Sequence, residues 1–161
     1  MKTNMGTQTG SRTAETYRTW FNDIDQQIVT QMDRWGTAVL RVALAVVFIW
    51  FGALKVAGIS PAEGLVIETV YVVPPEPFVI VLGVWEVLIG VCFLYKPLIR
   101  LGILLLFLQL PGTFLPLVLV PEAVYATFPH GLTVEGQYIV KNLVIIGAAL
   151  VVGSTVRSGE T

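Results

Sequence analysis

The stretch from Pro77 to Tyr95 reads PFVIVLGVWEVLIGVCFLY, and it decides the fold. A helix rises about 1.5 Å per residue, so about 20 apolar residues cross the ~30 Å hydrocarbon core of a bilayer. Three more stretches have a similar length and character: Gly36 to Lys55, Pro97 to Val120 and Tyr138 to Val156. The sequence therefore predicts an all-α integral membrane protein, a bundle of four spanning helices.

The composition supports this fold class and excludes several functions. Hydrophobic residues make up 55% of the chain and charged residues 13%, which is far more apolar than an ordinary soluble domain. The net charge of −1 gives no basic face for nucleic acid. With one cysteine and one histidine, the chain cannot form an intrachain disulfide, a bis-histidine haem site or a Cys/His metal cluster. We therefore predict no catalytic residue set and no metal or cofactor of its own; any redox centre would belong to a partner.

Basic residues lie on one side of the predicted membrane. They precede the first stretch, separate the second from the third and follow the fourth: Lys2, Arg12, Arg18, Arg34, Lys96, Arg100 and Arg157. The other two loops, residues 58–76 and 121–137, contain no lysine or arginine and carry five glutamates. The positive-inside rule then predicts that both termini are cytoplasmic, in the plasma (inner) membrane of a prokaryote.

The chain before the first span, residues 1–35, is predicted to be a polar tail followed by an amphipathic helix from Thr13 to Trp35. Its apolar positions recur at helical spacing, and four of them are candidates for docking a partner: Tyr17, Trp20, Phe21 and Ile24. The helix could lie in the cytoplasmic interface under the bundle. Since its polar face has more acids than bases, unlike helices that bind anionic lipid, docking to a partner protein is the alternative. Residues 36–156 form the bundle, and residues 157–161 a cytoplasmic tail.

Two loops and one span carry local signals. Residues 61–73 are predicted to form a short helix on the outer surface, because Pro74 and Pro75 stop it. In the third span, Pro111 and Pro116 each remove a helical hydrogen bond, so we expect a kink or break there. Such a kink either accommodates packing against a neighbouring helix or borders a cavity.

Polar residues interrupt all four spans, on helix faces that they share with small residues. The candidates for a buried polar or ligand site are Arg41, Lys55, Glu86, Gln109, Thr113, Lys141 and Asn142. Small residues mark close helix contacts in membranes, so these groups are predicted to face the bundle interior.

Glu86 is the most informative of them. It lies nine residues past Pro77, about 13 Å along a helix and so close to mid-membrane. A glutamate at that depth is protonated, faces water or is paired, here with Lys141 first or with Lys55. Either an ion pair that fixes helix register or a cavity with a ligand or proton role is consistent with this pattern.

These residues, in this order, resemble the DoxX-like membrane proteins, which include the small subunit of archaeal thiosulfate:quinone oxidoreductase. The matching pieces are Arg41 with the segment FIWFGALK (48–55), GVWEVLIG (83–90), PGT (111–113) and KNLVIIGAAL (141–150). The resemblance covers residues 36–156 and not the N-terminal segment. It implies a four-helix membrane bundle associated with redox or stress-defence systems, and it supplies no catalytic residues.

Three functions are consistent with these observations. The first is an accessory membrane subunit of an oxidoreductase or stress-defence complex, contributing a quinone or small-solute pocket and having no independent catalytic activity. The second is a small oligomeric transporter or channel with Glu86 as its proton or ion site. The third is a structural anchor that recruits a cytoplasmic partner. The partners expected are thus the lipid bilayer and either another protein or further copies of this chain.

Overall fold

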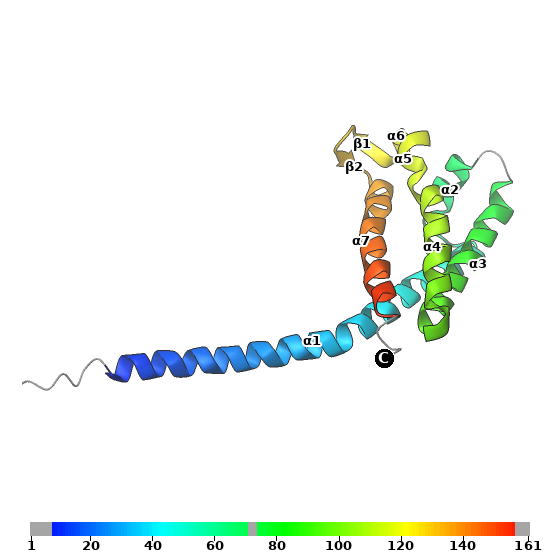
Figure 1. Ribbon diagram of the computed structural model, residues 1–161. Coiled ribbons are helices and arrows are strands. Elements are labelled where there is room, and N and C mark those ends of the chain that lie inside the picture. Colours follow the sequence, from blue (N-terminus) through cyan, green and yellow to red (C-terminus); the bar gives the residue numbers. More distant parts are fainter. Residues whose placement is uncertain (1–7, 71–73, 157–161) are drawn as a thin grey trace, which may run out of the picture. The chain divides into compact units, whose positions relative to one another are not determined.

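The computed structural model describes residues 8–70 and 74–156, with side chains from Trp20 onward. The described chain is mostly helical (Figure 1). Four of its helical stretches are long and apolar enough to cross a membrane: Trp20–Val56, Pro75–Leu94, Lys96–Leu119 and Val134–Ser154. A multi-pass membrane protein is therefore indicated, as the sequence predicted. The arrangement of these helices as a bundle in a bilayer stays a prediction.

The first helix is longer than expected. α1 runs from Gln8 to Val56 without interruption, whereas the sequence predicted an amphipathic helix ending at Trp35 and a separate span from Gly36. The physical reason is that Gly36 stands alone there, with no proline beside it; a single glycine costs a helix only about 1 kcal/mol relative to alanine. The chain divides into two compact units, residues 1–38 and 39–161.

The second unit continues with α2 (Glu63–Thr69) and α3 (Pro75–Leu94). A short 3₁₀ turn, η1 (Lys96–Leu98), leads into α4 (Ile99–Phe114), with Pro111 inside it. α4 ends just before α5 (Pro116–Leu119), so the third span breaks at the second proline as predicted. The predicted short helix in the first loop is also present, as α2, and it packs on α3 and α5.

The second loop departs from the all-α prediction. After α6 (Pro121–Val124), the strands β1 (Tyr125–Thr127) and β2 (Gly131–Leu132) pair antiparallel. α7 (Val134–Ser154) follows, and the Thr133 hydroxyl caps it by accepting a hydrogen bond from the Gly136 amide. Thr133 also donates to the Ala123 carbonyl at 2.7 Å, so this residue connects α6 to the start of α7.

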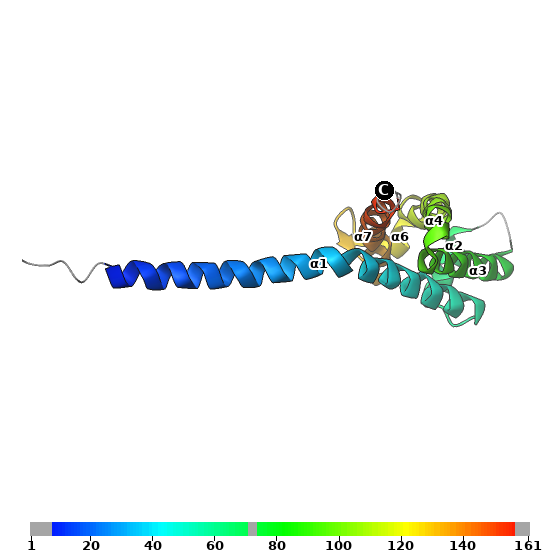
Figure 2. The same cartoon turned by 60° about the horizontal axis from the view of Figure 1, so that its bottom comes forward.

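Within residues 39–156, the connecting elements gather at two opposite ends. In Figure 1, α2, α5, α6 and the hairpin lie at one end, and the η1 turn and the end of α7 lie at the other. Figure 2 shows the same helices turned by 60°, with α3 and α4 side by side. The two acidic loops therefore share one end, and the basic turn with Lys96 and Arg100 belongs to the opposite end.

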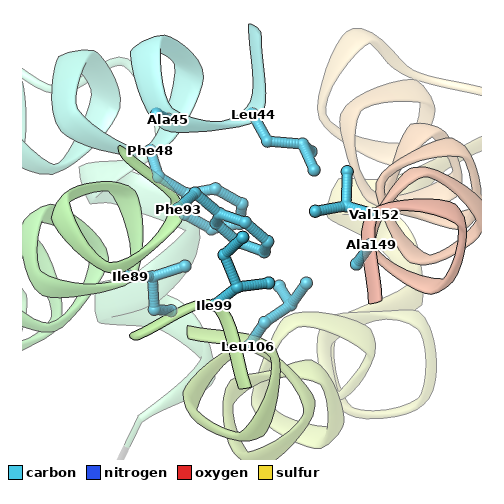
Figure 3. Close-up of a cluster of buried hydrophobic side chains, with 9 residues drawn as sticks. All are labelled: Leu44, Ala45, Phe48, Ile89, Phe93, Ile99, Leu106, Ala149 and Val152. Atoms are coloured by element: carbon cyan, nitrogen blue, oxygen red, sulfur yellow. The ribbon is translucent and has the colours of Figure 1, made fainter. Parts of the chain in front are cut away.

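A cluster of apolar side chains forms the core of this unit. It draws on α1, α3, α4 and α7 (Figure 3), and its members are Leu44, Ala45, Phe48, Ile89, Phe93, Ile99, Leu106, Ala149 and Val152. Many large apolar side chains point outward instead, among them Val81 and Val144, with exposed fractions of 62% and 73%. Such a surface is suited to lipid rather than to water.

Candidate functional site

A buried polar cluster joins three helices. The Lys55 ammonium of α1 lies 2.6 Å from Oε2 of Glu86 on α3. From α4, the Gln109 amide donates to the other carboxylate oxygen, Oε1, at 2.9 Å. The side chains of Lys55 and Glu86 are only 7% and 10% exposed. This Lys55–Glu86–Gln109 cluster brings together three of the candidate residues that the sequence nominated.

Close helix packing makes this ion pair possible. Gly52 of α1 faces Gly83 of α3 so closely that a Cβ on Gly52 would lie 2.5 Å from the Gly83 carbonyl oxygen. Two turns along, a Cβ on Gly90 would lie 2.8 Å from the Ala45 carbonyl oxygen. The Gly52–Gly83 and Ala45–Gly90 contacts are seven residues apart on each helix. The two antiparallel helices therefore stay in contact along one seam, as small residues allow in membranes.

The same seam positions the lysine. A Cβ on Gly83 would lie 2.8 Å from the Cβ of Lys55, so the missing side chain of Gly83 leaves room for the start of the Lys55 side chain. Glu86 follows Gly83 by three residues and lies on the same side of α3. The lysine therefore extends along α3 from Gly83 to the carboxylate.

The cluster satisfies the charges but leaves one amide oxygen without a partner. Burying a charge is costly unless it is paired and hydrogen-bonded. Both Glu86 oxygens accept hydrogen bonds, from Lys55 and Gln109 respectively. Among the described residues, nothing donates to the buried Oε1 of Gln109. The cluster therefore connects α1, α3 and α4 through polar contacts, and Oε1 of Gln109 is the acceptor that has no donor among the described residues.

Lys141 is not the partner of Glu86, and in this respect the sequence-based prediction was wrong. The Lys141 side chain is exposed, and its ammonium lies 5.2 Å from the ring centroid of Tyr138 on the same helix. Lys141 and Lys55 both lie near the same boundary of their spans, and position along a span does not say which helices are neighbours. α1 is the helix that packs on the glycine face of α3, so its lysine reaches Glu86.

The remaining candidates lie outside the cluster or at its edge. Thr113 donates weakly to the backbone carbonyl of Gln109, at 3.4 Å. Asn142 donates to two carbonyls of its own helix, those of Tyr138 and Ile139. Arg41 is half-buried, and its Nε has no hydrogen-bond partner among the described residues.

Trp85 is a contributor that sequence reasoning did not single out. Its indole N–H donates to the backbone carbonyl of Leu105 on α4, at 3.2 Å. A half-buried tryptophan needs such an acceptor. Trp85 and the adjacent Glu86 therefore both connect α3 to α4 through hydrogen bonds. The presence of Trp85 inside a predicted span was the available signal.

An open apolar groove runs along the other side of the α1–α3 seam. It has a volume of about 410 Å³ and is lined by Ala53, Val56, Ala57, Val84, Val87 and Leu88. At about 100° per residue, these positions lie across the Gly52–Gly83 contact from Lys55 and Glu86. No residue of the polar cluster borders the groove, which therefore suits a hydrocarbon chain and no polar group.

The N-terminal docking candidates belong to the first unit. The rings of Trp20 and Phe21 pack edge to face with centroids 5.2 Å apart. The side chain of Tyr17 lies outside the described residues, as does the predicted tail at 157–161. Among the described residues, no group of three or more His, Cys, Asp or Glu side chains could hold a metal ion.

Comparisons with known protein families, with curated proteins and with solved structures found no match. The candidate site therefore has to be judged on its geometry.

Proposed function

We propose that this chain is a membrane-embedded accessory subunit of an oxidoreductase or stress-defence complex, of the DoxX-like kind. The observation that supports this proposal best is the Lys55–Glu86–Gln109 cluster. Both carboxylate oxygens are engaged by neighbouring helices, so the strongest polar group in the spans serves to hold helices in register. Because Lys55 and Glu86 neutralise each other within the chain, their arrangement is consistent with a structural role as a scaffold for other subunits.

In this proposal, the chain lies in the plasma membrane of a prokaryote with both termini in the cytoplasm. The gathering of both acidic loops at one end, opposite the basic η1 turn, supports that orientation. The N-terminal segment with Trp20, Phe21 and Ile24 would contact a partner protein on the cytoplasmic side. A quinone or another lipid-soluble solute is the small-molecule partner that we propose, with its hydrocarbon chain in the groove beside Ala53 and Ala57.

One observation favours the alternative of a small oligomeric transporter. The Oε1 of Gln109 is buried beside the carboxylate without a donor among the described residues. An acceptor of this kind could receive a transported hydrogen-bond donor, and Glu86 would then serve as the proton or ion site. The alternative of a purely structural anchor rests on the N-terminal helix alone.

Reconstitution separates these functions. The chain is purified alone, placed in liposomes, and assayed for proton and solute flux and for quinone reduction. We expect neither activity, because a subunit needs its complex. Flux that Glu86→Gln abolishes would establish the transporter instead, and quinone reduction by the chain alone would also refute the subunit function. In parallel, the chain in native membranes should migrate as part of a complex larger than its own oligomers.

A further inference from the structure

Arg41 on α1 carries a charge that the described residues do not neutralise. Its Nε is buried and has no hydrogen-bond partner among them. Their recorded salt bridge is the Lys55–Glu86 pair, so no described carboxylate is paired with Arg41. A buried N–H without an acceptor is costly, because the group has lost water and gained no bond in exchange. An acceptor from outside the described residues would remove this cost.

Arg41 faces the interior of the unit formed by residues 39–156. Arg41, Phe48 and Lys55 follow one another at intervals of seven residues, which at about 100° per residue places them on one line along α1. Phe48 points into the apolar core (Figure 3), and Lys55 is buried. Arg41 is itself half-buried. The same line of α1 therefore carries a paired cation at one end and an unpaired cation at the other.

The seam between α1 and α3 places Arg41 at the end of α3. Ala45 lies against Gly90, and the two helices are antiparallel, so each step back along α1 is matched by one step forward along α3. Four steps bring Arg41 level with Leu94, the last residue of α3. The 20 residues of α3 are about as long as the hydrocarbon core is thick. Arg41 therefore lies near the level where the headgroups of a bilayer begin.

The charges at this end favour an anion. Arg41 shares the end with Lys96 of η1 and Arg100 of α4, both of which are exposed. The carboxylates of residues 39–156 lie elsewhere. Glu86 belongs to the buried pair, and the others lie toward the opposite end, with the acidic loops (Figure 1). The basic end therefore has no counter-charge from these residues and attracts negatively charged groups.

A lipid phosphate is the anion that fits this position best. Phosphate groups lie at headgroup level, and a guanidinium can donate to two phosphate oxygens at once. Basic pockets between membrane helices bind anionic lipid headgroups. A zwitterionic headgroup would bring its own ammonium group toward Lys96 and Arg100. A headgroup with a net negative charge is therefore preferred.

We propose that Arg41 binds the phosphate group of an anionic phospholipid at the basic end of residues 39–156. Arg41 donates hydrogen bonds to the phosphate oxygens, while the exposed Lys96 and Arg100 attract the net charge of the headgroup. This inference does not depend on the proposed function as a subunit, because a transporter or an anchor would hold such a lipid in the same way.

The test is thermal unfolding of the full chain, purified in detergent and titrated with lipid. Phosphatidylglycerol should raise the Tm saturably, whereas phosphatidylcholine with the same acyl chains should not. Arg41→Met keeps an apolar stem and removes the guanidinium. It should weaken the apparent phosphatidylglycerol affinity by roughly tenfold or more, as expected for a lost hydrogen bond between charged groups. Arg41→Lys keeps the charge without the two-oxygen contact and should weaken it less. Lys141→Met removes an exposed cation toward the opposite end, and as the matched control it should leave the affinity unchanged.

Unfolding without added lipid distinguishes a lipid site from a structural role. There Arg41→Met should unfold like the native chain, because the buried Nε forms no hydrogen bond among the described residues. Three results would overturn the proposal: equal stabilisation by both lipids, an unchanged phosphatidylglycerol affinity in Arg41→Met, and a Tm that Arg41→Met lowers equally with and without lipid. Inorganic phosphate alone should not raise the Tm. If it does so in the native chain and not in Arg41→Met, the ligand is free phosphate and the assignment to lipid is wrong.

Discussion

At the scale of single residues, the molecule depends on how one carboxylate is neutralised. Glu86 lies near the middle of α3, and its two oxygens are shared between a lysine of α1 and an amide of α4. Such a pair adds little stability relative to a well-packed apolar core, but losing one member leaves a buried charge unpaired. The effect of substitutions should therefore depend on which charge remains.

Lys55→Met should destabilise the fold by roughly 3–5 kcal/mol, because it leaves the Glu86 carboxylate buried beside one amide only. Combining Lys55→Met with Glu86→Leu should restore most of that loss, since no charge then remains in the core. The measurement is reversible unfolding of the purified chain in detergent, analysed as a double-mutant cycle. If the two single substitutions prove additive, Lys55 and Glu86 are not coupled.

Gln109→Leu should cost less than Lys55→Met, about 1–2 kcal/mol, because the charge pair survives and only one hydrogen bond to the carboxylate is lost. The loss is further reduced because Leu removes the amide oxygen that has no donor among the described residues. The same unfolding assay measures it, with the exposed Leu108→Gln substitution on the neighbouring position as a control. A cost above that of Lys55→Met would mean that Gln109, not the lysine, dominates the cluster.

Sequence reasoning found the members of the cluster but not all of its pairing. Glu86, Lys55 and Gln109 were nominated from depth and from the small residues on their faces. The pairing with Lys141 was wrong, because periodicity along one helix gives its faces and not the identity of the helix next to it. The contact between Gly52 and Gly83 decides that identity, and it depends on the packing of two distant segments.

At the scale of elements, the α1–α3 seam relies on two backbone contacts. A Cβ on Gly83 would lie 2.7 Å from the carbonyl oxygen of Gly52, a backbone atom that can retreat only if the helices separate. The seam therefore limits both the distance between the helices and the reach of Lys55.

Gly83→Ala should destabilise the chain by about 1–3 kcal/mol, because the added methyl group forces α1 away from α3. Gly147→Ala is the matched control: Gly147 lies within α7 with no atom near its Cβ position. There alanine should be neutral or stabilise the helix by up to about 1 kcal/mol. Unfolding of both variants in detergent is the measurement, and equal effects would refute close packing at Gly83.

Thr133→Ala should lower stability by about 1–2 kcal/mol, since it removes the cap of α7 together with the bond to the Ala123 carbonyl. Thr133→Ser keeps the hydroxyl and should retain most of the stability. Hydrogen exchange of the Gly136 amide reports the cap directly. Unchanged protection in the alanine variant would show that the cap does not stabilise the start of α7.

The elements themselves were predictable to different degrees. The four apolar stretches, the short helix after Pro61 and the break at Pro116 follow from length, hydropathy and proline chemistry. The hairpin at 125–132 was missed, although Tyr125 and Thr127 favour strands and Gly131 favours a turn. That local signal is short, and so small a hairpin depends on packing against its neighbours, here α6 and α7. The continuity of α1 through Gly36 was not predicted, although a lone glycine costs a helix too little to end it.

At the scale of the whole molecule, charge and connectivity point the same way. Within residues 39–156, the two loops that carry glutamates but no lysine or arginine lie at one end, whereas Lys96 and Arg100 occupy the opposite turn. The orientation is predicted from the sequence alone by the positive-inside rule. The fold independently groups the two loops that this rule assigns to the same side.

Glu63→Cys and Glu135→Cys should react with a membrane-impermeant maleimide added to intact cells, because both positions belong to the acidic end that is proposed to face outward. Lys96→Cys in the basic turn should react only after the membrane is permeabilised, so it serves as the matched control. The native Cys92 is buried within α3 and is replaced by alanine to remove any background. If Glu63→Cys and Glu135→Cys are protected while Lys96→Cys is labelled, the orientation is inverted. If the two acidic positions differ from each other, an odd number of crossings separates them and the four-span topology fails.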